Sequence, residues 1–411
     1  MEKLWNRNFA ILTIGSFVSA VGSCASGIGF AVLIYEQTGS ALMLALFTVA
    51  NAVPRILTGF LAGPFVDRHS RVRIIYALDF VCAACFTGLA AALFLDFYNT
   101  WVFTALAAFF GIVDTVYQLA FMTAFPEAVP NGSHHRAYSI ASLLWPVAGA
   151  IMSPLAVLIR DTVDHGIAWL MAINAATYLI AALFEVTMKL PEHLNTKEPI
   201  KFQFVEDFRE GFHYFRTEKG ILWITILFTV FNFGYGVHGV LTMPLILNGT
   251  TFLTLMDYAW IGTANSIGRI IGSIAHYFIV YPPKKRFRIA IFVYFIVEIF
   301  ACTVFYLPFL WIILAINFVD GLLAVTSYTI RTAATQVYIP GTLRGRINST
   351  QSFLWNIGSI IGVLAAGFAA EYTSFDYRVL FLFSAVITIG AIIFIPLRRK
   401  KEFEQVYNAE I

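Results

Sequence analysis

Three charged residues stand inside long apolar stretches of this chain, where a charge is costly and therefore informative. Asp114, Asp320 and Arg331 are flanked on both sides by apolar runs. A charge at the centre of a membrane helix costs about 2.5–3.5 kcal/mol on insertion scales, so each residue invites a functional hypothesis. A carboxyl group in a low-dielectric cavity can take up and release a proton near neutral pH. We therefore predict that Asp114 and Asp320 are proton-coupling residues.

Arg331 is predicted to lie on the same membrane helix as Asp320. The two residues are eleven positions apart, so on a helix they share one face about 16 Å apart along the axis. Arg331 is suited to hold a carboxylate in its ionised form or to meet an anionic substrate. The alternative is a structural ion pair among these three residues with no role in transport.

Uncharged polar residues add to the predicted cavity wall. Ser16, Ser19, Ser23 and Ser26 follow one another at helical steps of three or four, which gives one small polar face. Serines in membrane helices also bond to their own backbone or allow close packing, and that alternative stays open. Further along, a glycine-rich segment that we expect to break its helix is flanked by two more cavity candidates, Asn232 and His238.

Three more charges are predicted to form ion pairs inside the membrane. Arg55 and Arg269 occupy similar apolar stretches in the two halves of the chain, and each is a candidate partner for a carboxylate on a neighbouring helix. Glu298 is the expected partner of Arg269. We score Glu298 as structural, because peripheral helices seldom line a transport path.

The composition requires that these residues sit on membrane helices. Of the 411 residues, 59% are hydrophobic and only 12% are charged, and the mean hydropathy is +0.76. Soluble domains are closer to half apolar and a quarter charged. The apolar residues form runs of about twenty, which is long enough to cross the hydrocarbon core as helix. The fold class is therefore an all-α membrane protein, and the short alternating segments of a membrane β-barrel are not seen.

Turn-forming residues divide the chain into twelve predicted transmembrane helices. Their expected bounds are 9–35, 41–66, 73–95, 101–125, 137–160, 166–189, 220–247, 254–280, 288–307, 310–336, 347–370 and 377–397. A short amphipathic helix is expected before the seventh, since Phe208, Phe212 and Phe215 share one face opposite Asp207 and Glu210.

The distribution of lysine and arginine predicts the orientation of these helices. If the N-terminus is cytoplasmic, 22 of the 27 basic residues fall on the cytoplasmic side, two fall outside and three lie within helices. This asymmetry satisfies the positive-inside rule. We therefore expect both termini in the cytoplasm. The net charge of +3 reports this topology and does not indicate nucleic-acid binding.

The chain also repeats itself with an offset of 210 residues. Under this shift Pro130 meets Pro340, Arg136 meets Arg346, and the Leu-Trp pair at 144–145 meets its equal at 354–355. We predict two pseudo-symmetric six-helix halves, at 1–190 and 219–411, joined by a cytoplasmic linker at 191–218. Two such halves around a central binding site are typical of transporters.

The loop between the second and third predicted helices carries a family resemblance. Its sequence GPFVDRHSRVR (residues 63–73) resembles the GxxxDRxGRR loop of the major facilitator superfamily, with departures at Ser70 and Val72. The resemblance implies a conformational latch made by Gly63, Asp67, Arg68 and Arg71. We expect Asp67 to pair with Arg71, and Gly63 to let two helices approach closely. It also implies the major facilitator fold, in which helices 1, 4, 7 and 10 line the cavity, so that Asp114, Asp320 and Arg331 would face the substrate path and Arg331 is a substrate-cavity candidate.

Other segments resemble the macrolide-efflux-like group of proton-coupled drug exporters in that superfamily. They are the YEQTGS turn (35–40), the WPVAGAIMSP segment (145–154), the EGF element (210–212) and the Arg-x-x-Ser repeats at Arg136 and Arg346. The resemblance implies proton-coupled export of hydrophobic or amphipathic small molecules by alternating access. The alternatives of the same fold are a lysophospholipid flippase, a siderophore exporter and a nutrient importer.

The sequence argues against other classes of function. It contains no GxxxxGK[ST] phosphate loop for an ATP-driven pump and no HExxH zinc motif, and the adjacent His134 and His135 are a weak metal signal. We predict no enzyme activity, no cofactor and no bound metal. The expected partners are protons, a small-molecule substrate and the lipid bilayer, with no nucleic acid, and we expect a monomer in a bacterial cell membrane.

Overall fold

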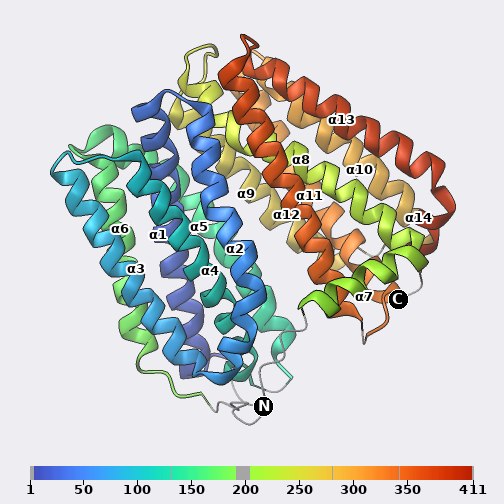
Figure 1. The fold of residues 1–411 in the computed structure, drawn as a ribbon, viewed down its shortest axis with the longest axis horizontal. Coiled ribbons are helices and arrows are strands. Elements are labelled where there is room, and N and C mark those ends of the chain that lie inside the picture. The colour runs from blue at the N-terminus through green and yellow to red at the C-terminus, as the bar shows by residue number, and fades with distance from the viewer. Residues whose placement is uncertain (1–3, 131, 191–203, 280, 342, 410–411) are drawn as a thin grey trace. The chain divides into compact units, whose positions relative to one another are not determined.

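The computed structural model is helical throughout the part of the chain that it describes, which is residues 4–130, 132–190, 204–279, 281–341 and 343–409 (Figure 1). Contacts group the chain into two compact units: unit 1 is residues 1–39 with 50–201, and unit 2 is residues 40–49 with 202–411. The first turns of the second helix therefore belong with unit 2. Our division at 1–190, 191–218 and 219–411 remains a proposal, and residues 191–203 of its linker lie outside the described residues.

Six long helices come first in the chain. They are α1 (Arg7–Thr38), α2 (Ala41–Arg68), α3 (Arg71–Phe94), α4 (Thr100–Ala128), α5 (His134–Thr162) and α6 (Gly166–Glu185). Asn6 caps α1 by accepting a hydrogen bond from the Phe9 amide at 2.8 Å, and Gly39 ends it in the left-handed conformation. In unit 1, α1 packs against α4, α5 and α6, while α3 packs against α4 and α6.

The remaining helices follow in the second half of the chain. They are α7 (Phe204–Thr217), α8 (Lys219–Leu247), α9 (Leu255–Phe278), α10 (Pro283–Thr303), the 3-10 turn η1 (Val304–Tyr306), α11 (Leu310–Tyr338), α12 (Arg344–Tyr372), α13 (Tyr377–Arg398) and α14 (Lys400–Tyr407). The predicted fold class is confirmed. Eleven of the described helices are long and apolar enough to cross a membrane. The remaining predicted span, the eighth in chain order (254–280), is α9. This helix is more polar and carries Asp257, Arg269 and His276.

The two short helices border the helix bundle of unit 2. The predicted amphipathic helix is present as α7, where Glu210 pairs with Arg346 and Gly211 lies directly against the Thr350 side chain of α12. Two motifs that stand far apart in the sequence therefore meet here. Helix α14 was not predicted. It buries Phe403 and Tyr407, and the Tyr407 hydroxyl lies 2.8 Å from that of Tyr294.

Close helix pairs depend on glycines that leave room for a facing backbone or side chain. Gly22 of α1 lies against Asn174 and Thr177 of α6, and Gly362 of α12 lies against the Phe233 carbonyl of α8. A side chain at either position would clash. Small residues therefore let these membrane helices approach closely, as van der Waals packing in a bilayer requires.

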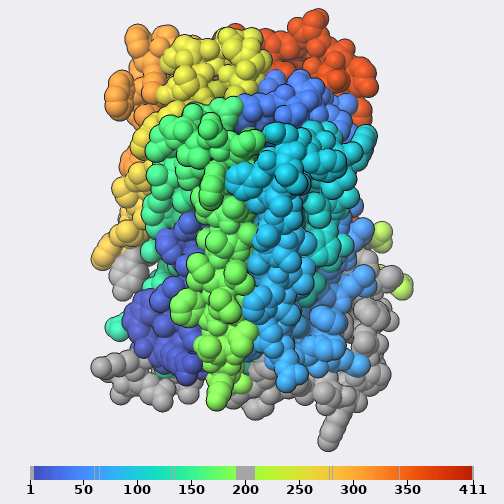
Figure 2. All heavy atoms as spheres, turned by 90° about the vertical axis from the view of Figure 1, so that its left-hand side faces the viewer, coloured from blue at the N-terminus to red at the C-terminus, as the bar shows by residue number. Residues whose placement is uncertain are grey.

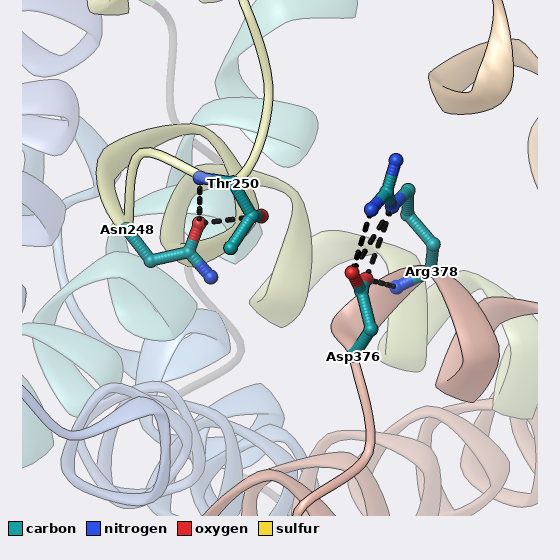
Figure 3. A network of polar contacts seen from close by, with 4 residues as sticks. All are labelled: Asn248, Thr250, Asp376 and Arg378. Carbon is teal, nitrogen blue, oxygen red and sulfur yellow. Dashed lines mark hydrogen bonds and ion pairs between the residues drawn. The ribbon is translucent and has the colours of Figure 1, made fainter.

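Side chains cap two helix ends of unit 2 near its loops (Figure 3). Asp376 accepts a hydrogen bond from the Arg378 amide at 2.8 Å and pairs with the Arg378 guanidinium at 2.7 Å, which fixes the start of α13. After α8, the Asn248 side chain accepts hydrogen bonds from the Thr250 amide and hydroxyl. These contacts fix the loop backbone by local hydrogen bonds.

Candidate functional site: charged groups at the helix crossings

The first predicted proton residue is an ion-pair partner. Arg55 Nε of α2 lies 3.4 Å from Asp114 Oδ2 of α4, and the two side chains are 56% and 40% exposed. The Thr115 hydroxyl donates a hydrogen bond to the Arg55 carbonyl at 3.1 Å. The sequence predicted a carboxylate partner for Arg55 on a neighbouring helix, and the structure shows that this partner is Asp114.

An asparagine and a glycine form the adjoining contact between these helices. Asn51 Nδ2 donates to the Ala107 carbonyl at 2.9 Å, and a side chain at Gly111 would clash with the Asn51 carbonyl oxygen. Because α2 and α4 meet so closely, Arg55 is placed one turn beyond the contact, beside Asp114. The pair is therefore positioned by backbone packing.

Unit 2 repeats this contact between α9 and α11. Asn265 Nδ2 donates to the Asn317 carbonyl at 3.3 Å, and a side chain at Gly321 would clash with the Asn265 carbonyl oxygen. Asn317 and Gly321 stand 210 positions after Ala107 and Gly111, so the offset found in the sequence is repeated in the contacts.

The second predicted proton residue lies at this crossing. Asn265 Nδ2 also donates to Asp320 Oδ2 at 3.0 Å. The other oxygen, Oδ1, is buried and has no hydrogen-bond partner among the described residues. Asp320 therefore receives an amide donor where Asp114 receives a guanidinium.

The expected ion pair between Arg269 and Glu298 is wrong. Glu298 of α10 is 3% exposed and accepts a hydrogen bond from the Thr388 hydroxyl of α13. Within the described chain, no ion pair joins Glu298 to Arg269. The reason is the packing order, because α10 packs mainly on α11 and α13, whereas Arg269 is on α9, which packs on α11.

Arg331 is enclosed by aromatic rings. Its guanidinium carbon lies 3.8 Å from the ring centroid of Phe228 on α8, 4.8 Å from Trp355 on α12 and 5.9 Å from Tyr328 on its own helix. It forms no ion pair with a described carboxylate, and so not with Asp320. Cation–π contacts stabilise the charge while leaving its hydrogen-bond donors available for an anionic group.

The predicted latch residues have different partners from those expected. Arg71, at the start of α3, pairs with Glu127 at the end of α4, and not with Asp67. Asp67 is exposed, and no described atom lies within 4 Å of the place that a Gly63 side chain would take. The latch role of Gly63 stays a prediction. Glu127 was missed, although a carboxylate at the end of the fourth predicted helix was visible in the sequence.

The serine face of α1 points into the interior of unit 1. Ser23 lies within hydrogen-bonding distance of the Tyr178 hydroxyl at 3.1 Å, and Ser26 accepts from Asn174 Nδ2 at 2.7 Å. The hydroxyl oxygens of Ser16 and Ser19 are buried without a described partner. Since both bonded serines face α6, the geometry favours the packing interpretation for Ser23.

The glycine-rich segment does not break its helix, because α8 is continuous from Lys219 to Leu247. Gly236 packs against the Ser359 carbonyl of α12, so close packing accounts for a glycine here. Asn232 donates to the Phe228 carbonyl of its own helix at 2.7 Å. The His238 ring stacks on Phe381 with centroids 4.4 Å apart, and its buried Nε2 has no described partner. His238 is therefore packed against an aromatic ring.

Sequence reasoning missed two buried carboxyl groups, Asp79 of α3 and Glu185 of α6. They are 1% and 0% exposed. A charge inside an apolar run was the signal that identified Asp114, and it marks these two as well. Within the described chain, no group of three or more His, Cys, Asp or Glu side chains is arranged to hold a metal ion.

The solved structures most like this chain include transporters of different substrates. A mutant of the nucleoside transporter NupG has a TM-score of 0.75 at 12% identity, over 95% of this chain and 99% of that one. A D-xylose-proton symporter has a TM-score of 0.70 at 12% identity, over 96% and 97%. At such identities the likeness shows the fold alone.

Curated relatives include efflux proteins. Macrolide efflux protein A of Streptococcus pyogenes is 23% identical over 261 residues, which is 63% of this chain, and the chain spans 62% of that relative. Multidrug efflux pump Tap of Mycolicibacterium fortuitum is 23% identical over an alignment that covers 95% of each chain. The sequence model described as Major Facilitator Superfamily matches residues 12–305 and 240–409. The chain therefore belongs to the major facilitator superfamily of membrane transporters.

Proposed function

We propose that this transporter exports hydrophobic or amphipathic small molecules of the macrolide or multidrug type, in exchange for protons. The observation that carries the proposal is the pair of carboxyl groups on α4 and α11, Asp114 and Asp320, each placed beside the same asparagine–glycine helix contact of its unit. Each carboxyl group lies within a membrane helix and has a polar partner on the neighbouring helix. The efflux relatives support the direction and the cargo class.

The cavity roles of the other residues are part of the same proposal. Arg331, with its guanidinium held between aromatic rings, provides a cationic and aromatic surface for an amphipathic cargo. We also propose that Asp67, Arg68 and Arg71 act as a conformational latch. The protein is proposed to be a monomer in a bacterial cell membrane, with both termini in the cytoplasm.

Proton movement in proteoliposomes tests the proposal. A pH gradient is imposed, and macrolides, lipophilic cations, siderophores and lysophospholipids are added in turn while a pH-sensitive dye is followed. We expect one of the first two classes to collapse the gradient with the wild type, and to fail with Asp114→Asn or Asp320→Asn.

Asp96→Asn is the matched control. Asp96 is 86% exposed in a loop and has a positive φ of 55°, a conformation that asparagine tolerates well. We expect the Asp96→Asn variant to collapse the pH gradient when the active compound is added, as the wild type does. A labelled cargo that crosses with the wild type while no protons move would refute proton coupling and indicate a facilitator or flippase. A response to siderophores or lysophospholipids alone would refute the cargo class.

A further inference from the structure

Two carboxyl groups meet in the interior of unit 1, away from the helix crossings described above. Asp79 of α3 and Glu185 of α6 are both almost completely buried, and their carboxyl groups lie within hydrogen-bonding reach of each other. Figure 2 shows the face of unit 1 along which α3 (light blue) and α6 (green) lie side by side. No lysine or arginine of the described residues forms an ion pair with either group.

This contact requires a proton. An ionised carboxylate only accepts hydrogen bonds, so two carboxyl groups can bond to each other only if one of them is protonated. Two buried negative charges in contact, without a cation, are very costly. Asp79 Oδ2 and both oxygens of Glu185 have no donor among the described residues. One proton shared by the pair supplies the missing donor.

The side chains around the pair are hydroxyl-bearing and uncharged. Glu185 Oε1 lies 3.2 Å from the place that a Cβ at position 15 of α1 would take, so Gly15 leaves room for the carboxyl group. The hydroxyl oxygens of Ser16 on α1 and Tyr117 on α4 are buried, and neither completes a hydrogen bond of ordinary geometry. Tyr117 faces both carboxyl groups and Ser16.

The remaining titratable groups that face the pair are also neutral near pH 7. They are Tyr178 on α6 and Cys82 on α3. Helix α5, which packs on α1 and α6, has no titratable side chain between Tyr138 and Arg160. Since no cation faces the pair, a proton remains the means of neutralising it.

Unit 2 also buries a glutamate between helices, but with a different partner. There Glu298 of α10 meets the Thr388 hydroxyl of α13, and Glu298 Oε1 lies 3.5 Å from the place that a Cβ of Gly234 on α8 would take. A glycine on the first long helix of each unit thus faces a buried glutamate. In unit 2 a hydroxyl group is the donor, so that contact forms without an added proton.

We propose that Asp79 and Glu185 form a binding site for one proton, which the transporter takes up and releases in its cycle. Tyr117 stands three residues after Asp114 on α4, so it is within one turn of that carboxylate. This places a hydroxyl group between the exposed Asp114–Arg55 pair and the buried pair. The exchange during transport rests on the proposed function, whereas the bound proton does not.

Infrared spectroscopy of the reconstituted protein tests the bound proton without any transport. We expect a protonated-carboxyl band at neutral pH that shifts in heavy water, and a weaker band in the double variant Asp79→Asn with Glu185→Gln, because a single substitution leaves one buried carboxyl group that still needs a proton. Asp96→Asn, which removes an exposed carboxylate, should leave the band in place. A band as strong in the double variant as in the wild type would overturn the proposal, as would a wild-type band that disappears on addition of sodium at constant pH, which would indicate a cation site.

Transport assays then test the exchange. We expect Asp79→Asn and Glu185→Gln to retain counterflow of a labelled macrolide or lipophilic cation, which also shows that both variants fold. We expect both variants to lose uphill export of the same compound driven by a pH gradient. Glu298→Gln is the matched control and should retain both, because a glutamine oxygen still accepts from Thr388. Uphill export at the wild-type rate in both pair variants would overturn the inference. If the wild type shows no uphill export while the infrared band is present, the proposed function fails and the proton site stands.

Discussion

The two units share their helix contacts and differ in the charged groups that those contacts position. At the α2–α4 crossing the asparagine–glycine contact is followed by an arginine–aspartate ion pair. At the α9–α11 crossing the same contact holds an aspartate through the asparagine amide, and Arg269 forms no ion pair among the described residues. The contacts that allow two helices to approach are therefore common to both units, while the polar chemistry beside them is not.

This difference indicates which features the repeat preserves for folding. Where a backbone carbonyl packs directly against a glycine, no larger residue fits, so both units need a glycine at this position. A carboxyl group can pair with an arginine, accept a hydrogen bond from an amide or a hydroxyl group, or share a proton with a second carboxyl group, and we infer that the two units use all four arrangements.

The largest effect is expected from filling the shared contact. Gly111→Val and Gly321→Val each place a side chain against a backbone carbonyl, which cannot move without shifting a helix. We expect each to lower the free energy of unfolding by about 3 kcal/mol, the upper end of overpacking. Thermal unfolding in detergent, followed by circular dichroism, measures the loss.

Matched controls for these variants lie in the same two units. No described atom is within 4 Å of the place that a side chain would take at Gly88 in α3 or Gly390 in α13. Gly88→Ala and Gly390→Ala should unfold at or above the wild-type temperature. If only one of the two crossings is sensitive to valine, the shared contact is not equally important in both units.

A smaller effect is expected from removing the asparagine of unit 2. Asn265→Ala leaves Asp320 without its amide donor, so that both carboxyl oxygens lack a partner among the described residues. We expect a loss of about 2 kcal/mol, the cost of an unsatisfied buried polar group. Asn51→Ala removes only the bond to the Ala107 carbonyl and should cost less. Equal losses of unfolding free energy in Asn265→Ala and Asn51→Ala would contradict the proposed difference between the two asparagines.

The sequence predicted the helices well because each is a long apolar run bounded by turn residues. Helix α8 was expected at 220–247 and is found at Lys219–Leu247. Helix α14 was missed because eight amphipathic residues carry little periodic signal. The partners of Arg71 and Glu298 could not be predicted, since they depend on which helices pack together. Asp79 and Glu185 were visible as charges in apolar runs, but only the structure shows that they touch.

The start of the last long helix in each unit gives a further contrast. Helix α13 begins with the Asp376 cap and its pair with Arg378 (Figure 3), whereas α6 begins after His165, which has a positive φ of 53° and makes no capping hydrogen bond. We expect Asp376→Ala to cost about 1 kcal/mol at neutral pH. Asp376→Asn should cost less, because asparagine also caps.

This cap also predicts a dependence on pH. The hydrogen bond from Arg378 lowers the pKa of the Asp376 carboxyl group below its ordinary value. The stabilisation is therefore present above the ordinary aspartate pKa and is lost as the pH falls through the lowered one. The gap in unfolding free energy between wild type and Asp376→Ala should narrow on acidification. A gap that widens in acid would contradict the role of the ionised carboxylate.

The smallest effect on stability is expected at the ion pair of unit 1. Arg55 and Asp114 are about half exposed, so Arg55→Gln should change the free energy of unfolding by only about 0.5 kcal/mol. Its effect on transport should be larger, because Asp114 then lacks its ion-pair partner. Reversing the pair with Arg55→Asp and Asp114→Arg together should restore stability. If the reversed pair also restored proton-driven export, Asp114 would act only through its ion pair. The carboxyl pair of Asp79 and Glu185 would then be the sole proton site that we propose in unit 1.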